Sequence, residues 1–438
     1  VSTLILARIL TPEDFGLVAI ATLAFGLVEV LSQSGSSQYI ITREKVSEKE
    51  LNTAFTYNLI LKSLIAFIFY LTSPIIAEFY GDDRITSILE VFSLMLLIIG
   101  FENPQIYLLK KNQEYKKIVK MILISKITST IFAISTALII KNYWALIAGQ
   151  MIAYSLPIIG GYIISPYMPR IELKNIKSQF SFSAWLVPSS MLGYFRSQID
   201  TVIISKLFDS HILGNYHVMK YLAFIPTQNL IGPITQPLLA QLTSIKNSGK
   251  YFLKMFNVSM FTTLFIAVFI STIFLFQHKN IVYLLLGEQW VSNSKILAIF
   301  GVLIISTALN NQATNLLMIK NKNKYILIFE SMAFFLIIIS FIYLDLNSTI
   351  EFVNTKVTIE FLYGVMMILI SSKFLINSFS VTYCILLFSP IFLSAAISCS
   401  LAQYLFKAEL SSLNLIIWSA TFSGLYFSIT YLTIKLLS

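Results

Sequence analysis

The chain has 438 residues, of which 56% are hydrophobic and 12% are charged, and its formal net charge is +10. The charged share is about half that of an ordinary soluble domain, and the mean hydropathy is +0.78. A soluble fold of this size has too little interior for so much apolar surface, whereas a bilayer accepts helices of about 20 apolar residues. The composition excludes a soluble enzyme, a disordered chain and a disulfide-rich secreted scaffold.

Apolar runs bounded by charged or turn residues predict an all-α integral membrane protein with thirteen complete spans. A shorter apolar stretch at residues 1–10 precedes them, and we expect it to be the end of a truncated first span. The polytopic bundle would then hold about 14 transmembrane helices. The thirteen predicted spans are residues 16–40, 55–79, 86–109, 118–140, 143–165, 180–208, 212–240, 253–276, 296–319, 325–344, 352–372, 380–405 and 413–436.

The distribution of basic residues predicts the orientation of these spans. One set of alternate connections holds nineteen Lys and Arg residues, and the opposite set holds eight. Because Lys and Arg gather in short cytoplasmic loops, the loop after residue 40 and the C-terminus are predicted to be cytoplasmic. The loop with Asp82 and Asp83 then faces outside. The excess of Lys and Arg is therefore explained by membrane topology, and we expect no nucleic-acid partner.

An internal repeat relates the two halves of the chain. Residues 3–16 align without a gap with residues 201–214, so that Thr3 meets Thr201 and Gly16 meets Gly214, 198 residues further on. This offset contains six spans, and an even number preserves orientation, which indicates parallel repeats. We expect an N-terminal lobe with an incomplete first helix, a second six-helix lobe and two additional C-terminal helices, at residues 1–166, 180–372 and 380–438 respectively.

Charges within spans are the first candidates for function, because each costs about 2.5–3.5 kcal/mol at a helix centre. Arg196 and Asp200 lie four residues apart in span 180–208, hence on one helix face. In one interpretation Arg196 binds an anionic substrate, while Asp200 orients it or exchanges a proton. In the other, the two form a structural ion pair within the helix.

Four further charges carry similar alternatives. Lys220 is either a second cation for the substrate or a side chain that snorkels to the outer interface. Lys62 and Lys126 lie near predicted cytoplasmic helix ends, where snorkelling is expected. Glu29, near the middle of its span, is either a proton or cation carrier or a hydrogen-bonded contact between helices.

Polar and helix-breaking residues complete the candidates. Asn310 and Asn311, with Gln312 and Asn315, either bind sugar or join neighbouring helices by hydrogen bonds. Glu102 precedes Asn103 and Pro104, which together mark a candidate helix break, and the prolines from 226 to 237 predict another distortion. The two cysteines and three histidines show no metal-ligand spacing. We expect no metal and no cofactor.

Several segments resemble the Wzx-like oligosaccharide-lipid flippases of bacteria, which belong to the multidrug/oligosaccharidyl-lipid/polysaccharide exporter superfamily. The variant that handles colanic- or teichuronic-acid-type polymers is most similar. The resemblance covers about residues 1–320 and then fades. It is carried by LARILTPEDFGLVAIATLAFGLVEVLSQSGSSQYIITRE at 6–44, SEKELNTAFTYNLIL at 47–61, SPIIAEFYG at 73–81, YWALIAGQ at 143–150 and YFRSQIDTVIISKLF at 194–208.

The resemblance implies a MATE-like fold with two lobes around a central cavity in the bacterial cytoplasmic membrane. The implied activity is the transfer of undecaprenyl-diphosphate-linked oligosaccharide to the outer leaflet by alternating access. Arg196, Asp200, Lys220, Asn310 and Asn311 would bind the substrate in a cationic cavity, and Glu29 and Asp200 would couple transport to an ion. Expected partners are the membrane, the lipid-linked oligosaccharide, a polysaccharide polymerase and a chain-length regulator.

A drug or organic-cation antiporter of the same superfamily is the alternative. It predicts a cavity dominated by acids, whereas the charges within spans here include Arg196 and Lys220. A membrane enzyme needs a sizeable outer loop with acid–base groups, and the connections predicted here are short. We therefore expect a transporter and not an enzyme.

Overall fold

The computed structural model contains only helices and connections in the residues that it describes, and 88% of those residues are helical. The chain divides into two compact units, Val1–His217 and Val218–Ser438. The described residues are 2–43, 45–112, 114–174, 176–232, 234–235, 238, 241–242, 245–320, 322–344, 348–376, 381–405 and 412–437.

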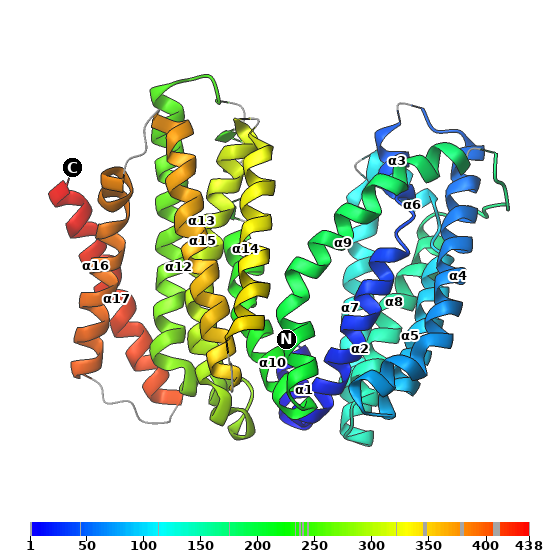
Figure 1. The fold of residues 1–438 in the computed structure, drawn as a ribbon, viewed down its shortest axis with the longest axis horizontal. Coiled ribbons are helices and arrows are strands. Elements are labelled where there is room, and N and C mark those ends of the chain that lie inside the picture. The colour runs from blue at the N-terminus through cyan, green and yellow to red at the C-terminus, as the bar shows by residue number, and fades with distance from the viewer. Residues whose placement is uncertain are drawn as a thin grey trace. The chain divides into compact units, whose positions relative to one another are not determined.

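The first unit contains nine helices in its described part and the start of a tenth (Figure 1). These are α1 (Ser2–Ile9), α2 (Pro12–Leu31), α3 (Ser36–Thr42), α4 (Glu48–Tyr80), α5 (Arg84–Gly100), α6 (Gln105–Lys111), α7 (Tyr115–Ile140), α8 (Trp144–Ile164), α9 (Ile176–Leu207) and α10 (Ser210–Pro226). In the second unit, α10 continues into η1 (Thr227–Ile231), followed by α12 (Lys250–Leu285), η2 (Glu288–Asn293), α13 (Lys295–Ile319), α14 (Asn323–Tyr343), α15 (Thr349–Ile376), α16 (Val381–Leu405) and α17 (Ser412–Leu437).

Nine helices of the described chain are long and apolar enough to cross a membrane, and the bent pair α5–α6 passes the same test together. Other apolar helices accompany them. The predicted all-α, multi-span membrane class is thus confirmed, while the total of about 14 spans stays a prediction.

Two predicted spans of the first unit are broken helices. The prediction of one continuous span at 16–40 was wrong, because α2 ends at Leu31 and α3 begins at Ser36. Gly35 between them has φ 62°, a left-handed conformation that glycine adopts without strain. The break predicted at Glu102 is confirmed: α5 and α6 are bent by 67°, and Asn103 accepts a hydrogen bond from the Gln105 amide at 3.0 Å.

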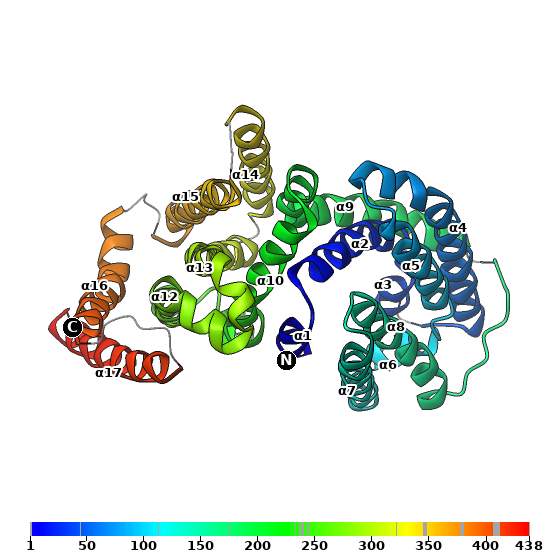
Figure 2. The ribbon, with the colours of Figure 1, turned by 90° about the horizontal axis from the view of Figure 1, so that it is seen from below.

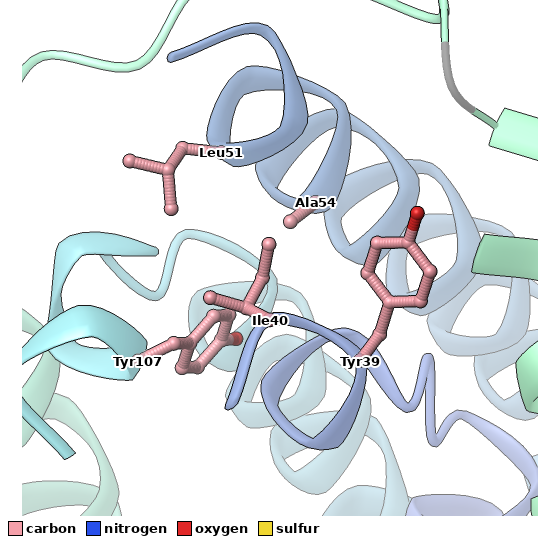
Figure 3. Close-up of a cluster of buried hydrophobic side chains, with 5 residues drawn as sticks. All are labelled: Tyr39, Ile40, Leu51, Ala54 and Tyr107. Atoms are coloured by element: carbon pink, nitrogen blue, oxygen red, sulfur yellow. The ribbon is translucent and has the colours of Figure 1, made fainter. Parts of the chain in front are cut away.

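The short helices α3 and α6 pack against the start of α4 (Figure 3). Tyr39 and Ile40 come from α3, Leu51 and Ala54 from α4, and Tyr107 from α6, and all five side chains are buried. The guanidinium of Arg43 lies 4.5 Å from the centre of the Tyr39 ring. Around this cluster, α4 pairs with α5 and α7 pairs with α8, and α2 lies beside α9 (Figure 2).

In the second unit, α13 packs against α12 and α15, and aromatic rings attach α17 to α12. The rings of Phe265 and Tyr426 are stacked 4.7 Å apart, and the Tyr426 hydroxyl donates to the Phe265 carbonyl at 3.1 Å. The distortion predicted after Pro226 is confirmed in the described residues, because Thr227–Ile231 forms a π-helical turn.

The connection between α4 and α5 is braced by Arg84. Its guanidinium contacts Glu13 at 2.7 Å and Asp82 at 2.7 Å, and the hydrogen bonds from Arg84 hold the pKa of Asp82 below its usual range. A carboxyl group with a lowered pKa stabilises the folded state at pH values above its ordinary pKa. This contribution is lost as the pH falls through the lowered pKa of the folded state.

We expect Arg84→Gln to lower the stability of the fold slightly, by under about 1 kcal/mol, because these groups are partly exposed and screened by solvent. The difference from the unmodified protein should persist from neutral pH to about pH 4 and disappear only below it. Melting temperatures measured across this range test the prediction. A difference that vanishes between pH 7 and pH 5 would contradict it.

Candidate functional site

Lys62 is buried in the first unit, with 7% of its surface exposed. Its Nζ donates at 3.4 Å to the Oγ of Ser32, the C-cap residue that follows α2. The prediction that Lys62 snorkels was wrong. Because α4 begins at Glu48 rather than near residue 55, Lys62 lies about 20 Å along the helix from its first residue, beyond the reach of its side chain.

Two carboxylates act on the Lys62 ammonium from other elements. Glu29, on the last turn of α2, and Glu102, in the break between α5 and α6, both interact with it electrostatically. Glu102 also accepts a hydrogen bond from the Tyr107 hydroxyl at 2.9 Å. We call Glu29, Lys62 and Glu102 the Lys62 cluster. With both carboxylates ionised its net charge is −1, so one bound proton or monovalent cation neutralises it.

Tyrosines of two further helices act on the carboxylates of the cluster. Tyr154 on α8 and Tyr194 on α9 interact electrostatically with Glu29, and Tyr162 on α8 interacts with Glu102. The Tyr194 hydroxyl donates to the Leu23 carbonyl of α2 at 2.6 Å. Five helices and one helix break therefore supply one polar site inside an apolar unit. The sequence analysis missed these tyrosines, because only the packing of distant helices brings them together.

The structure places Asp200 next to α10. Its side chain is fully buried on α9 and accepts a hydrogen bond from the hydroxyl of Tyr216. The side chain of Arg196 lies outside the described residues, so its pairing with Asp200 stays a prediction. Tyr216 is a further residue that the sequence did not single out as a partner of Asp200.

The candidate residues of the second unit divide between two environments. Gln312, which is 1% exposed, donates to Thr263 of α12 at 2.7 Å and therefore joins α13 to α12. Asn311 is exposed and Asn310 is half-buried, so neither is buried in this joint. Lys220 is half-buried on α10. Gln312 thus joins two helices, while the roles of Asn310, Asn311 and Lys220 in substrate binding stay predictions.

Asn52 of α4 holds the segment between α8 and α9. Its Oδ1 accepts hydrogen bonds from the Tyr167 hydroxyl at 2.7 Å and the Arg170 amide at 2.9 Å, and its Nδ2 donates to Glu172 at 3.4 Å. The side chain is 4% exposed. No local sequence signal indicated this contact, because its partners lie more than a hundred residues away in sequence.

We expect Asn52→Ala to lower the free energy of unfolding by about 1–3 kcal/mol, because buried partners lose their hydrogen bonds. Thermal melting of the purified protein measures the effect. Asn112→Ala, at an exposed position, is the matched control. Equal melting temperatures for the two variants would show that Asn52 does not hold the segment.

Residues 5–295, more than half of the chain, match the profile of a family described as "Polysaccharide biosynthesis protein". The chain belongs to this family. The resemblance stated from the sequence is thereby confirmed.

Curated proteins of similar sequence agree with the family. The "Lipopolysaccharide biosynthesis protein WzxC" of Escherichia coli K12 is 23% identical over 332 residues, which are 72% of this chain and 65% of that protein. An "Uncharacterized membrane protein in cps region" of Klebsiella pneumoniae is 26% identical over 330 residues, 73% of this chain and 67% of that protein. The chain thus spans about two thirds of the length of these relatives.

Solved structures show that the fold is shared. The "Lipid II flippase MurJ, inward closed conformation" superposes with a TM-score of 0.77 at 15% identity, over 100% of this chain and 97% of that chain. An inward-facing multidrug resistance MATE family transporter of the MOP superfamily gives 0.59 at 13% identity, over 86% and 95% of the two chains. The expected MATE-like fold is confirmed for this family member.

Proposed function

We propose that the chain is a flippase for surface polysaccharide biosynthesis. It moves an oligosaccharide linked to undecaprenyl diphosphate from the inner to the outer leaflet of the bacterial cytoplasmic membrane. The family match over residues 5–295 carries this proposal. It is supported by relatives such as WzxC and the "Teichuronic acid biosynthesis protein TuaB" of Bacillus subtilis, 21% identical over 305 residues.

The substrate sets separate physical tasks for the protein. The diphosphate needs cations, the sugars need hydrogen-bond partners, and the prenyl chain can remain in lipid. We assign the diphosphate to Arg196 and Lys220, and the sugar to Asn310 and Asn311. Lys62 is not assigned to the substrate, because Glu29 and Glu102 already act on its charge.

We assign ion coupling to Glu29 and Asp200. The Lys62 cluster supports this role, because a partly buried group of net charge −1 attracts one proton or monovalent cation. Loading and release at such a site bias a two-state transporter only if the two states bind the ion differently. In alternating access, the lobes at 1–166 and 180–372 would provide those states, with residues 380–438 as additional helices.

The topology and partners complete the proposal. The C-terminus and the loop after residue 40 face the cytoplasm, and the loop with Asp82 faces outside, as the charge distribution favours. The chain acts as a transporter rather than an enzyme. A polymerase and a chain-length regulator act on the substrate after transfer.

The leaflet distribution of the lipid-linked oligosaccharide in cells tests this function. Cells without the protein should accumulate it in the inner leaflet, and the full-length gene should restore transfer. An Arg196→Ala copy should not, whereas Ser197→Ala, an exposed change one residue further, should. A normal distribution without the protein, together with lost resistance to organic cations, would instead identify a drug antiporter.

Two neighbouring amides separate sugar binding from helix packing. We expect Asn311→Ala to reduce transport at least several-fold while leaving the melting temperature unchanged, because the side chain is exposed. Gln312→Leu should instead destabilise the fold by about 1–3 kcal/mol, since the buried Ser259 hydroxyl loses its hydrogen bonds with the amide and Thr263 loses the one that it accepts. Transport and melting are measured on both variants. Native transport by Asn311→Ala would remove this residue from the sugar site.

A further inference from the structure

Helix α7 has two faces of different character. One face packs against α8 and carries small buried side chains, at Ser125, Ser129, Ala133 and Ala137. A methyl group on Gly149 of α8 would lie 2.6 Å from the Cβ of Ala133, so the two helices approach closely there (Figure 2). The side chains on the opposite face are exposed. This second face is therefore available to the membrane around the first unit.

One stripe of exposed side chains runs along this second face. Its members are three or four residues apart, which places them on the same side of an α-helix. The stripe starts with two lysines and continues with aliphatic residues, in the order Lys116, Lys120, Leu123, Ile127 and Ile131. The aliphatic part rises about 12 Å along the helix, most of the roughly 15 Å that one leaflet adds to the hydrocarbon core. A charged headgroup followed by acyl chains has the same order.

Positive charge is concentrated at the start of α7. Residues 110–120 contain five lysines and one glutamate, which gives this segment a net charge of +4. The connection at the other end of the helix, residues 141–143, contains a single lysine. Tyr115, the first residue of α7, is 52% exposed, and tyrosine is enriched where a membrane meets water. We therefore place Lys116 and Lys120 at the predicted cytoplasmic surface of the membrane.

Two of the five lysines are turned onto the protein. Lys110 lies 5.8 Å from the centre of the Tyr107 ring, and Lys111 donates to the carbonyl of Arg43. Tyr107 belongs to α6, and Arg43 is the residue that follows α3. These two ammonium groups therefore brace the short helices of the first unit.

The three lysines on the first turns of α7 differ in their partners. Lys117 pairs with Glu114 at 3.7 Å. Lys116 and Lys120 are exposed, and in the described part of the chain neither forms an ion pair with a carboxylate. Because these two lysines are four residues apart, they are neighbours on the helix surface and both can reach one phosphate group.

We propose that the exposed face of α7 binds an anionic phospholipid of the cytoplasmic leaflet. Lys116 and Lys120 hold its phosphate, and its acyl chains lie along Leu123 and Ile127. A free anion would leave the aliphatic part of the stripe uncovered, whereas a phospholipid covers the charged and the apolar parts together. The inference goes beyond the proposed transport function and does not depend on it.

The orientation of the protein in the membrane does not require this stripe. Orientation depends on the number of Lys and Arg residues in a loop, not on the helix face that they occupy. A lipid site instead requires the charges and the apolar surface to share one face. Each lysine near an anionic membrane surface strengthens binding about fivefold, so two lysines on one face distinguish anionic from zwitterionic lipid.

Competition between two lipids tests the site on the purified full-length protein. Native mass spectrometry counts the lipids that the protein retains from equal amounts of dioleoyl phosphatidylglycerol and dioleoyl phosphatidylcholine. We expect a preference for phosphatidylglycerol of about fivefold or more. Lys116→Gln with Lys120→Gln should reduce this preference to less than about twofold. Lys110→Gln with Lys117→Gln removes the same amount of charge from other directions and should retain the preference.

Three results would overturn the site. Equal retention of the two lipids by the unmodified protein would show that it does not select anionic lipid. An equal loss of preference in the two double variants would show a response to total charge rather than to the stripe. Displacement of phosphatidylglycerol by inorganic phosphate at the same concentration would show an anion site without a lipid.

Thermal melting is a second measurement, which also checks folding. Without phosphatidylglycerol, Lys116→Gln with Lys120→Gln should melt like the unmodified protein, because both side chains are exposed. Adding this lipid should raise the melting temperature of the unmodified protein, since a ligand that binds the folded state stabilises it. The increase for the double variant should be less than half as large. Equal increases would contradict the site.

Discussion

Lys62→Met is expected to abolish transport and to lower the free energy of unfolding by about 1–3 kcal/mol, because it removes a buried ammonium that acts on two half-buried carboxylates. The reason is that Glu29 and Glu102 keep their negative charges inside an apolar unit without the ammonium that offsets them. Melting of the purified protein and leaflet transfer in vesicles measure the two effects.

Two comparisons isolate the cause. Lys126→Met, at an exposed position on α7, should change neither stability nor transport. Removing all three charges, as Lys62→Met with Glu29→Gln and Glu102→Gln, should recover most of the lost stability but no transport, because an apolar replacement relieves the unpaired charges without restoring the ion site. If Lys62→Met alone transports at the native rate, the cluster has no role in the mechanism.

Asp200→Asn is expected to reduce transport at least tenfold with little loss of stability. The amide oxygen still accepts the hydrogen bond from Tyr216, so the buried contact survives, but the group no longer exchanges a proton or carries charge. Asp200→Ala should reduce transport equally and also cost about 1–3 kcal/mol of stability, because it leaves the buried Tyr216 hydroxyl without this acceptor.

Tyr216→Phe provides the complementary control for Asp200. It removes the donor but keeps the carboxylate, so it should lower stability while leaving substantial transport. Transfer rates in vesicles and melting temperatures separate the variants. Native transport by Asp200→Asn would assign Asp200 to the structural interpretation and leave Glu29 as the ion-coupling candidate.

Hydropathy predicted most of the fold, because a bilayer imposes a length and a composition on every spanning helix. The predicted spans 143–165 and 296–319 differ by one residue at each end or less from α8 and α13. Hydropathy does not detect a change of backbone direction, so the α2–α3 break at Gly35 was missed. The α5–α6 break was predicted because Asn103 and Pro104 carry a local signal.

The candidate site was predicted only in part. Glu29 and Asp200 were candidates because they are charged residues within predicted spans, and both have polar neighbours in the structure. The environment of Lys62 was mispredicted, because an error of seven residues in the start of α4 moved it near the end of its helix. The tyrosines that interact with Glu29 come from α8 and α9. No pattern within one sequence shows that residues of different helices come together.

Transfer by the purified full-length protein in vesicles tests the central claim most directly. An undecaprenyl-diphosphate oligosaccharide labelled on its sugar is placed in one leaflet, and its appearance in the other is followed with and without proton and sodium gradients. We predict transfer by the unmodified protein, with a rate that responds to one of the gradients, and none by Lys62→Met. Transfer no faster than in protein-free vesicles under every gradient would contradict the account.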